Sequence, residues 1–250
     1  MRYFIEFAYK GTHYHGWQYQ PSAISVQETL NKVFSTLLQD EIDIVGAGRT
    51  DSGVHASQMY GHFDTEKTLD LEQLKYKANS FLPKDIAIFK IIKVHDEAHA
   101  RFDATSRTYN YHISTVKDVF NNELTWYSQQ KLDIEAMNSA AKLLLNFTDF
   151  QCFSKSNTDV FTYNCDITEA YWTVKDNELI FTISADRFLR NMVRAIVGTL
   201  VNIGLHKITI DDFIKIIESK DRKKAGFSVP AQGLFLTQIK YPYINNDENI

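Results

Sequence analysis

The chain has little cysteine, no long apolar run and no excess of positive charge, and each shortage excludes a class of protein. Its 250 residues include two cysteines, Cys152 and Cys165, which are too few for a disulfide framework and lack the paired spacing of a zinc site. No apolar stretch approaches the length that spans a bilayer. The net charge of −4 argues against a protein that wraps nucleic acid with its whole surface, but it is compatible with a local basic stripe.

Targeting and linker signals are also missing. The first residues, Met1–Phe7, alternate as in a β-strand and contain no charged leader, apolar run or cleavage site. No low-complexity linker divides the chain. With 44% hydrophobic and 23% charged residues, the composition is that of a soluble globular protein that buries its core without metals or disulfides. We therefore expect a cytoplasmic protein with no membrane association.

Hydrophobic periodicity predicts alternating strands and helices along the chain. The expected strands are residues 2–9, 59–63, 86–94, 106–114, 166–174, 178–185 and 234–241. The expected helices are residues 25–39, 70–81, 133–145 and 187–203, with a short one after Thr209. Short connections favour antiparallel neighbours, so we predict an α+β fold. Its two similar halves, 1–105 and 106–250, are expected to form a mixed, mainly antiparallel sheet flanked by helices.

Residues 46–56 form the most unusual stretch. Three glycines within eight residues follow an apolar strand end, and glycine permits backbone conformations and close approaches that side chains forbid. Asp51 stands at the apex, two residues after Arg49. Two interpretations are open: a carboxylate presented as a nucleophile or base, or an ordinary turn in which the aspartate bonds its own backbone. The residues alone favour the turn.

Arg194 interrupts an expected helix that is apolar on nearly every side over 192–203. A buried arginine needs a carboxylate or a polyanion, whereas a helix turned to expose Arg194 does not, and the spacing favours neither. Arg187, Arg190 and Arg194 are three and four residues apart, so in one continuous helix they share a face. Such a face suits a cleft that grips phosphates outside and holds one carboxylate inside. Asp51 is the leading candidate for that carboxylate.

A basic and aromatic cluster opens the second half, consisting of Arg101, Arg107, Tyr109, Tyr111 and His112. Tyr109 and Tyr111 share one face of the expected strand, where each either stacks on a base or packs in the core. Packing is the commoner outcome for each one singly. The basic run Lys220–Lys224 follows a helix and suits either a solvated helix end or a phosphate contact.

These features fall within blocks that resemble the tRNA pseudouridine synthase A family. Residues 46–56, with the sequence GAGRTDSGVHA, are similar to the family's catalytic motif. Four further blocks occur in the family's order, at residues 9–20, 100–111, 188–200 and 233–236. The resemblance covers nearly the whole chain.

The resemblance implies a pseudouridine synthase fold with a central RNA-binding cleft. It implies isomerisation of uridine to pseudouridine at positions 38, 39 and 40 of tRNA, in the anticodon stem-loop, by a homodimer that needs no cofactor or metal. Asp51 matches the catalytic aspartate, Arg194 its basic partner, and Tyr109 the tyrosine that stacks on the target base and is a candidate for proton transfer. Arg49 matches an arginine that helps hold the flipped nucleotide, and Leu234 the apolar residue beneath it.

Phosphate binding by Arg187, Arg190 and the Lys220–Lys224 run would reconcile a negative chain with a polyanionic substrate. Two other classes of function remain open. A metal-dependent hydrolase would use His13, His15, Asp51 and His55, although their spacing is unlike that of a metal-binding helix. A non-catalytic RNA-binding module would keep the arginines and tyrosines for grip alone.

Overall fold

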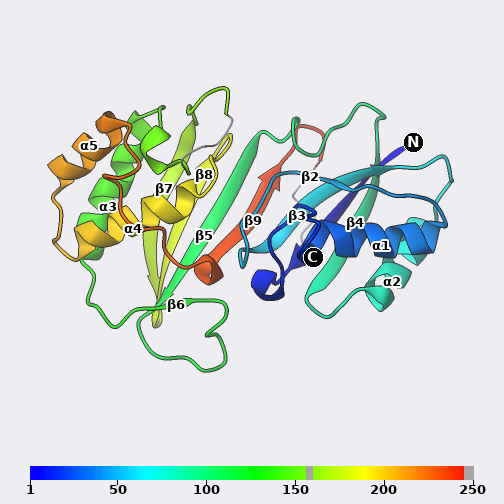
Figure 1. Ribbon diagram of the computed structural model, residues 1–250, viewed down its shortest axis with the longest axis horizontal. Coiled ribbons are helices and arrows are strands. Elements are labelled where there is room, and N and C mark those ends of the chain that lie inside the picture. The colour runs from blue at the N-terminus through cyan, green and yellow to red at the C-terminus, as the bar shows by residue number, and fades with distance from the viewer. Residues whose placement is uncertain (156–159, 245–250) are drawn as a thin grey trace. The chain divides into compact units, whose positions relative to one another are not determined.

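The computed structural model describes residues 1–155 and 160–244, which form two compact units. Unit 1 comprises Met1–Thr105 and the chain from Leu236 on, and unit 2 comprises Ser106–Phe235. The chain passes from unit 1 to unit 2 after residue 105 and returns to unit 1 after residue 235. Each unit combines strands with helices (Figure 1), so the α+β class is confirmed.

Unit 1 is built on the strands β1 (Arg2–Tyr9), β3 (His55–Asp64) and β4 (Ile86–Val94). β1 pairs antiparallel with both β3 and β4, the short β2 (Val45–Gly46) pairs with β3, and β9 (Leu234–Lys240) follows β3 in the strand order. β3 begins at His55, four residues earlier than expected, so the last two residues of the 46–56 motif already belong to the strand. The motif thus leads directly into a strand of the unit's sheet.

Two capped helices pack on unit 1. Ser25 accepts the Glu28 N–H at the start of α1 (Val26–Leu38), and Asp70 accepts the Gln73 N–H at the start of α2 (Leu71–Phe81). Both helices lie on the same face of the strands (Figure 1), where Phe34 of α1 packs on Phe63 of β3 with ring centroids 5.3 Å apart. This packing supports the strands that flank the motif.

Unit 2 contains β5 (Ser106–Ser114), β6 (Trp126–Tyr127), β7 (Ile167–Lys175) and β8 (Glu178–Ala185). β8 pairs antiparallel with β5 and β7, whereas β6 runs parallel to β5, so the pairing is mixed and mainly antiparallel, as predicted. The three helices α3 (Ile134–Leu143), α4 (Met192–Gly204) and α5 (Ile210–Ser219) contact one another. Within the described ranges, no helix is long and apolar enough to cross a membrane.

The helix expected over 187–203 begins later, and this changes the arginine face. Asn191 adopts a left-handed conformation (φ 65°), which asparagine tolerates better than most residues and which interrupts a right-handed helix. The Met192 N–H bonds the Leu189 carbonyl, closing a turn before α4 starts. Arg187 and Arg190 therefore precede the helix, and the prediction that they share a helical face with Arg194 is wrong.

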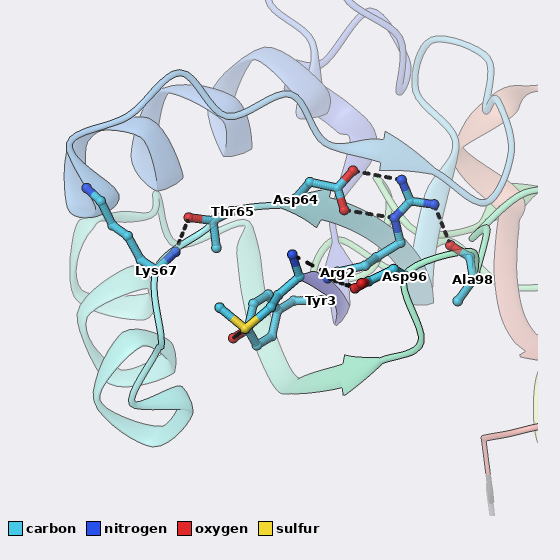
Figure 2. A network of polar contacts seen from close by, with 8 residues as sticks. Arg2, Tyr3, Asp64, Thr65, Lys67, Asp96 and Ala98 are labelled. Atoms are coloured by element: carbon cyan, nitrogen blue, oxygen red, sulfur yellow. Dashed lines mark hydrogen bonds and ion pairs between the residues drawn. The ribbon is translucent and has the colours of Figure 1, made fainter.

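A charged network fixes the end of unit 1 remote from the motif. Arg2 donates from Nε and Nη2 to the two carboxylate oxygens of Asp64, at 2.9 and 2.7 Å, and from Nη1 to the Ala98 carbonyl at 2.9 Å (Figure 2). The Arg2 backbone N–H also bonds Asp96, at 3.2 Å. The guanidinium holds the pKa of the Asp64 carboxyl below its usual value. This end of the sheet thus depends on charge pairing.

Candidate active site

The motif loop, residues 47–54, connects β2 to β3 and carries Asp51 at a tight turn. The Ala47 N–H bonds the Tyr60 carbonyl at 2.8 Å, and the Val54 N–H bonds the Asp51 carbonyl at 3.2 Å. Gly53 has φ 77°, and it occupies the third position of this turn, where positive φ favours glycine. Asp51 is half-buried, so its carboxyl is partly open to a ligand.

A second loop, residues 10–17, braces the motif loop on both sides of Asp51. The Trp17 N–H donates to the Thr50 carbonyl, and the Gly53 N–H donates to the Tyr14 carbonyl, both at 3.3 Å. The Tyr9 hydroxyl, at the end of β1, lies 2.8 Å from the Thr50 hydroxyl. Residues before and after Asp51 are therefore tied to a rigid neighbour, which limits how far the carboxyl moves.

Glycines have unequal roles in this packing. A Cβ added to Gly11 would lie 2.0 Å from the Val54 carbonyl oxygen, so the two loops touch backbone to backbone there. Around Gly48, apart from its chain neighbours, no described atom lies within 4 Å of an added Cβ. Packing therefore requires glycine at position 11 and leaves space at position 48.

His55 and Tyr14 tie the 10–17 loop to neighbouring parts of unit 1 through buried side chains. His55 is 1% exposed, and its Nδ1 accepts the Gly11 N–H at 2.9 Å, so the neutral ring carries its proton on Nε2. The buried Tyr14 hydroxyl donates to Asp85 at 2.8 Å, and burial together with this carboxylate raises the pKa of Tyr14. Tyr14 therefore stays a neutral donor, and His55 serves as a structural acceptor.

The same geometry bears on the metal-dependent alternative. His55 already uses Nδ1 for the Gly11 N–H, and His13 and His15 are exposed on the bracing loop. In the part of the chain that the structure describes, no three His, Cys, Asp or Glu side chains are grouped so as to hold a metal ion. The hydrolase hypothesis thus gains no support from the described residues.

In unit 2, Arg194 lies on α4 and is half-buried, between the two alternatives that the sequence left open. Its Nε donates to the Val229 carbonyl at 2.7 Å, and its own carbonyl accepts the Val229 N–H at 3.2 Å. A guanidinium held at Nε has a fixed plane, which suits directed pairing with a carboxylate.

The two tyrosines of β5 have different surroundings, although they share a face of the strand. Tyr111 is fully buried, and its hydroxyl bonds the Pro230 carbonyl at 2.9 Å. Tyr109 is half-buried and meets Phe188 edge to face, with centroids 5.2 Å apart. Leu234, 6% exposed, follows Gly233, where an added Cβ would lie 2.8 Å from the Tyr111 ring. Tyr111 is thus a core residue, and Tyr109 is the more accessible ring.

A sequence model described as tRNA pseudouridine synthase matches residues 6–103 and 140–242. The chain belongs to the tRNA pseudouridine synthase family. The matched ranges contain Asp51, Arg194 and Leu234, whereas Tyr109 lies between them.

Close relatives extend the match over nearly the whole chain. Proteins named tRNA pseudouridine synthase A are 53% identical over 243 residues in Bacteroides fragilis and 54% identical over 242 residues in Parabacteroides distasonis, covering 96% of both chains in each case. One from Acetivibrio thermocellus is 39% identical over 235 residues, covering 93% of this chain and 96% of the relative. The family resemblance predicted from the motif blocks is confirmed.

The other basic residues predicted to bind the substrate lie on different segments of the chain. Arg49 is exposed on the motif loop of unit 1. In unit 2, the half-buried Arg187 donates from Nη1 to the Thr162 carbonyl at 3.5 Å, and Arg190 is exposed before α4. Lys220 pairs with Asp149 at 2.7 Å, and Arg222 bonds the backbone nearby. The basic run is therefore partly committed to structural contacts.

Sequence reasoning missed the structural roles of the residues that hold the candidate groups in place. Tyr9, Tyr14 and His55 fix the motif loop, whereas Ser228 and Val229 contact the region of Arg194. The first set has a local signal, because two glycines separate aromatic residues in the 9–20 block. The second set has no periodic signal, since its contacts join residues about 35 positions apart.

Proposed function

We propose that this chain converts uridine to pseudouridine in the anticodon stem-loop of tRNA, at positions 38, 39 and 40, with Asp51 as the nucleophile or base. The observation that carries the proposal is the half-buried Asp51 in the family's motif loop, braced on both sides by the 10–17 loop. The relatives named tRNA pseudouridine synthase A support the choice of tRNA as substrate.

The proposed reaction is redox-neutral. The bond between N1 and C1′ breaks, the base rotates, a bond between C5 and C1′ forms, and the C5 proton is lost while N1 gains a proton. A carboxylate serves this isomerisation by attacking C1′ or C6, or by removing a proton to give a glycal. The proposal therefore includes no cofactor and no metal.

Other residues have roles in binding the flipped base. Extrusion of the uridine costs a few kcal/mol, and stacking on an aromatic ring offsets part of that cost. The accessible Tyr109 ring suits this stacking, and its hydroxyl is a candidate for the proton transfer. Leu234 supplies an apolar support, Arg49 contacts the flipped nucleotide, and Arg194 is the basic partner of Asp51.

Phosphate binding is assigned to Arg187 and Arg190, which precede α4. Their contribution is electrostatic and insensitive to sequence, so their removal should weaken tRNA binding and its salt dependence without changing the chemical step. The proposal also includes a central RNA-binding cleft formed by the two α+β halves of each chain, as the family resemblance implies. The resemblance likewise implies a homodimer, and we place the protein in the cytoplasm. Light scattering of the purified protein tests the dimer.

The deciding experiment incubates the protein with unmodified tRNA and maps pseudouridine at positions 38–40. We expect product without added metal and in the presence of a chelator. Asp51→Asn should lower the single-turnover rate by at least about 10³-fold, because the amide cannot act as a nucleophile or base. Its tRNA affinity should stay within about twofold of the wild-type value, since no phosphate contact is removed.

Glu41→Gln is the matched control, because it makes the same acid-to-amide change at an exposed residue before β2. It should retain full turnover. Turnover by Asp51→Asn at the wild-type rate would contradict the assignment of the nucleophile. Tight tRNA binding by the wild-type protein with no product at any uridine would favour the non-catalytic RNA-binding module instead.

A further inference from the structure

A short backbone segment, residues 226–229, lies directly against α4 in unit 2. A Cβ added to Gly198 would lie 1.8 Å from the Phe227 carbonyl oxygen, so the segment and the helix touch with no side chain between them. The Gly226 N–H donates to the Thr199 hydroxyl at 2.8 Å. The contact is therefore both close and directional, and a shift of this segment is transmitted to the helix surface.

Arg222 also contacts the same segment. Its guanidinium donates from Nη1 to the Gly226 carbonyl at 3.0 Å and from Nη2 to the Ser228 hydroxyl at 2.9 Å. The Asn191 side chain, at the start of α4, also donates to the Ser228 hydroxyl, at 2.6 Å. Arg222 thus fixes two points of a four-residue segment.

The segment ends at the residue that orients Arg194. The Val229 carbonyl accepts from Arg194 Nε at 2.7 Å, and the Val229 N–H donates to the Arg194 carbonyl at 3.2 Å. Ser228, which Arg222 and Asn191 both contact, directly precedes Val229. Removal of the Arg222 contacts would leave the segment held by Thr199, Asn191 and the Arg194 backbone. The Val229 carbonyl, and with it the plane of the Arg194 guanidinium, would then be held less firmly.

We propose that Arg222 is a positioning residue for the isomerisation: it fixes the 226–229 segment so that the Val229 carbonyl holds Arg194 in the orientation that pairs with a carboxylate. This inference rests on the proposed function, in which Arg194 is the partner of Asp51. It assigns Arg222 a role different from phosphate binding, the alternative that the Lys220–Lys224 run suggests from sequence.

The two roles predict different measurements. A phosphate contact raises tRNA affinity, and its loss lowers the salt slope of log K by roughly 0.7–0.9 without slowing the chemical step. A positioning residue changes the rate at saturating tRNA and leaves the affinity nearly unchanged. The conservative variant separates the two roles further, because Arg222→Lys keeps a positive charge for a phosphate but cannot reproduce both guanidinium hydrogen bonds.

The experiment compares wild-type protein, Arg222→Met, Arg222→Lys and Lys207→Met in single-turnover pseudouridine formation with saturating unmodified tRNA. Arg222→Met keeps the length of the side chain and removes its donors, whereas Lys207 is an exposed lysine of unit 2 outside the basic run. We expect Arg222→Met to be about tenfold slower or more, with tRNA affinity within about twofold, and Arg222→Lys to stay slow. Lys207→Met should retain the wild-type rate and affinity.

A wild-type rate for Arg222→Met, or a wild-type rate restored by Arg222→Lys, would overturn the positioning role. Weaker binding with a smaller salt slope would establish a phosphate contact instead. If Arg222→Met does not fold, Ser228→Ala replaces it, because that change removes the shared acceptor and keeps the arginine charge. The same slower rate at saturating tRNA with nearly unchanged affinity is then expected, and its absence overturns the proposal. A wild-type protein that forms no pseudouridine refutes the proposed function itself.

Discussion

The two ends of β3 are held by the same kind of hydrogen bond in different surroundings. At the start of the strand, the buried His55 accepts the Gly11 N–H at Nδ1, and near its end the buried His62 accepts the Ala100 N–H at Nδ1, at 3.2 Å. The first imidazole belongs to the motif end and the second to the end that carries the Arg2 network. The same hydrogen bond, from a backbone N–H to a buried imidazole, thus occurs at both ends of β3.

The settings differ in the groups that accept hydrogen bonds. At the motif end, the loops are joined mainly through backbone carbonyls and hydroxyls. At the His62 end, the acceptors are carboxylates. Asp64 accepts from Arg2, and Asp103 accepts from the His99 N–H and the Tyr243 hydroxyl. The motif end therefore depends on backbone geometry, and the His62 end depends on charge and pH.

The largest expected effect tests the backbone geometry of the motif end. Gly11→Ala should lower the free energy of unfolding by about 3 kcal/mol and abolish most activity, because its Cβ would overlap the Val54 carbonyl oxygen. Gly48→Ala is the matched control, and its stability should change by less than about 1 kcal/mol, since the added methyl group meets open space. Urea unfolding of both variants measures the difference, and equal stabilities would contradict the claim that the motif end depends on close backbone packing at Gly11.

Acid should selectively weaken the His62 end. Burial, reinforced by the positive charge of Arg2 and by His99, lowers the pKa of His62 to about 4, against the opposing effect of Asp64 and Asp103. The unfolded chain binds this proton near pH 6.5, before the folded chain does. Stability should therefore fall between about pH 6.5 and pH 4, by about 2 kcal/mol at pH 4.5, and this contribution should level off below pH 4.

Urea unfolding of the wild-type protein and of His62→Gln at pH 7.0 and pH 4.5 isolates this effect. The variant cannot bind the extra proton, so its loss of stability over the same range should be smaller by about 2 kcal/mol. Identical pH dependence in the two proteins would show that His62 is not the group responsible.

The smallest expected effect compares one hydroxyl at each end. Tyr9→Phe removes the bond to Thr50, and Tyr243→Phe removes the bond to Asp103 at 2.8 Å. Each should cost about 1 kcal/mol of stability. Only Tyr9→Phe should slow pseudouridine formation, by several-fold, because Thr50 adjoins Asp51. Single-turnover rates at a temperature where both variants are folded provide the test, and equal rates would remove the functional distinction between the ends.

Much of the fold was predictable because its signals are local. The helix starts expected at residues 25, 70 and 133 and after Thr209 agree with the structure to within a residue. Ser25, Asp70, Asp133 and Thr209 each directly precede a helix and accept the backbone N–H three residues later. The prediction of a shared helical face for the three arginines was wrong for an equally local reason. Spacing alone does not reveal that Asn191 takes a left-handed conformation and that α4 starts after it.

The sequence by itself determined the family and the residues proposed for the reaction, because a continuous motif such as GAGRTDSGVHA is recognisable without knowledge of its tertiary contacts. The tertiary structure decided what holds those residues. The bonds from Gly11 to His55 and from Arg194 to Val229 join positions 44 and 35 residues apart. Such contacts exist only once strand pairing and helix packing have placed the backbone, so no periodicity in the sequence encodes them.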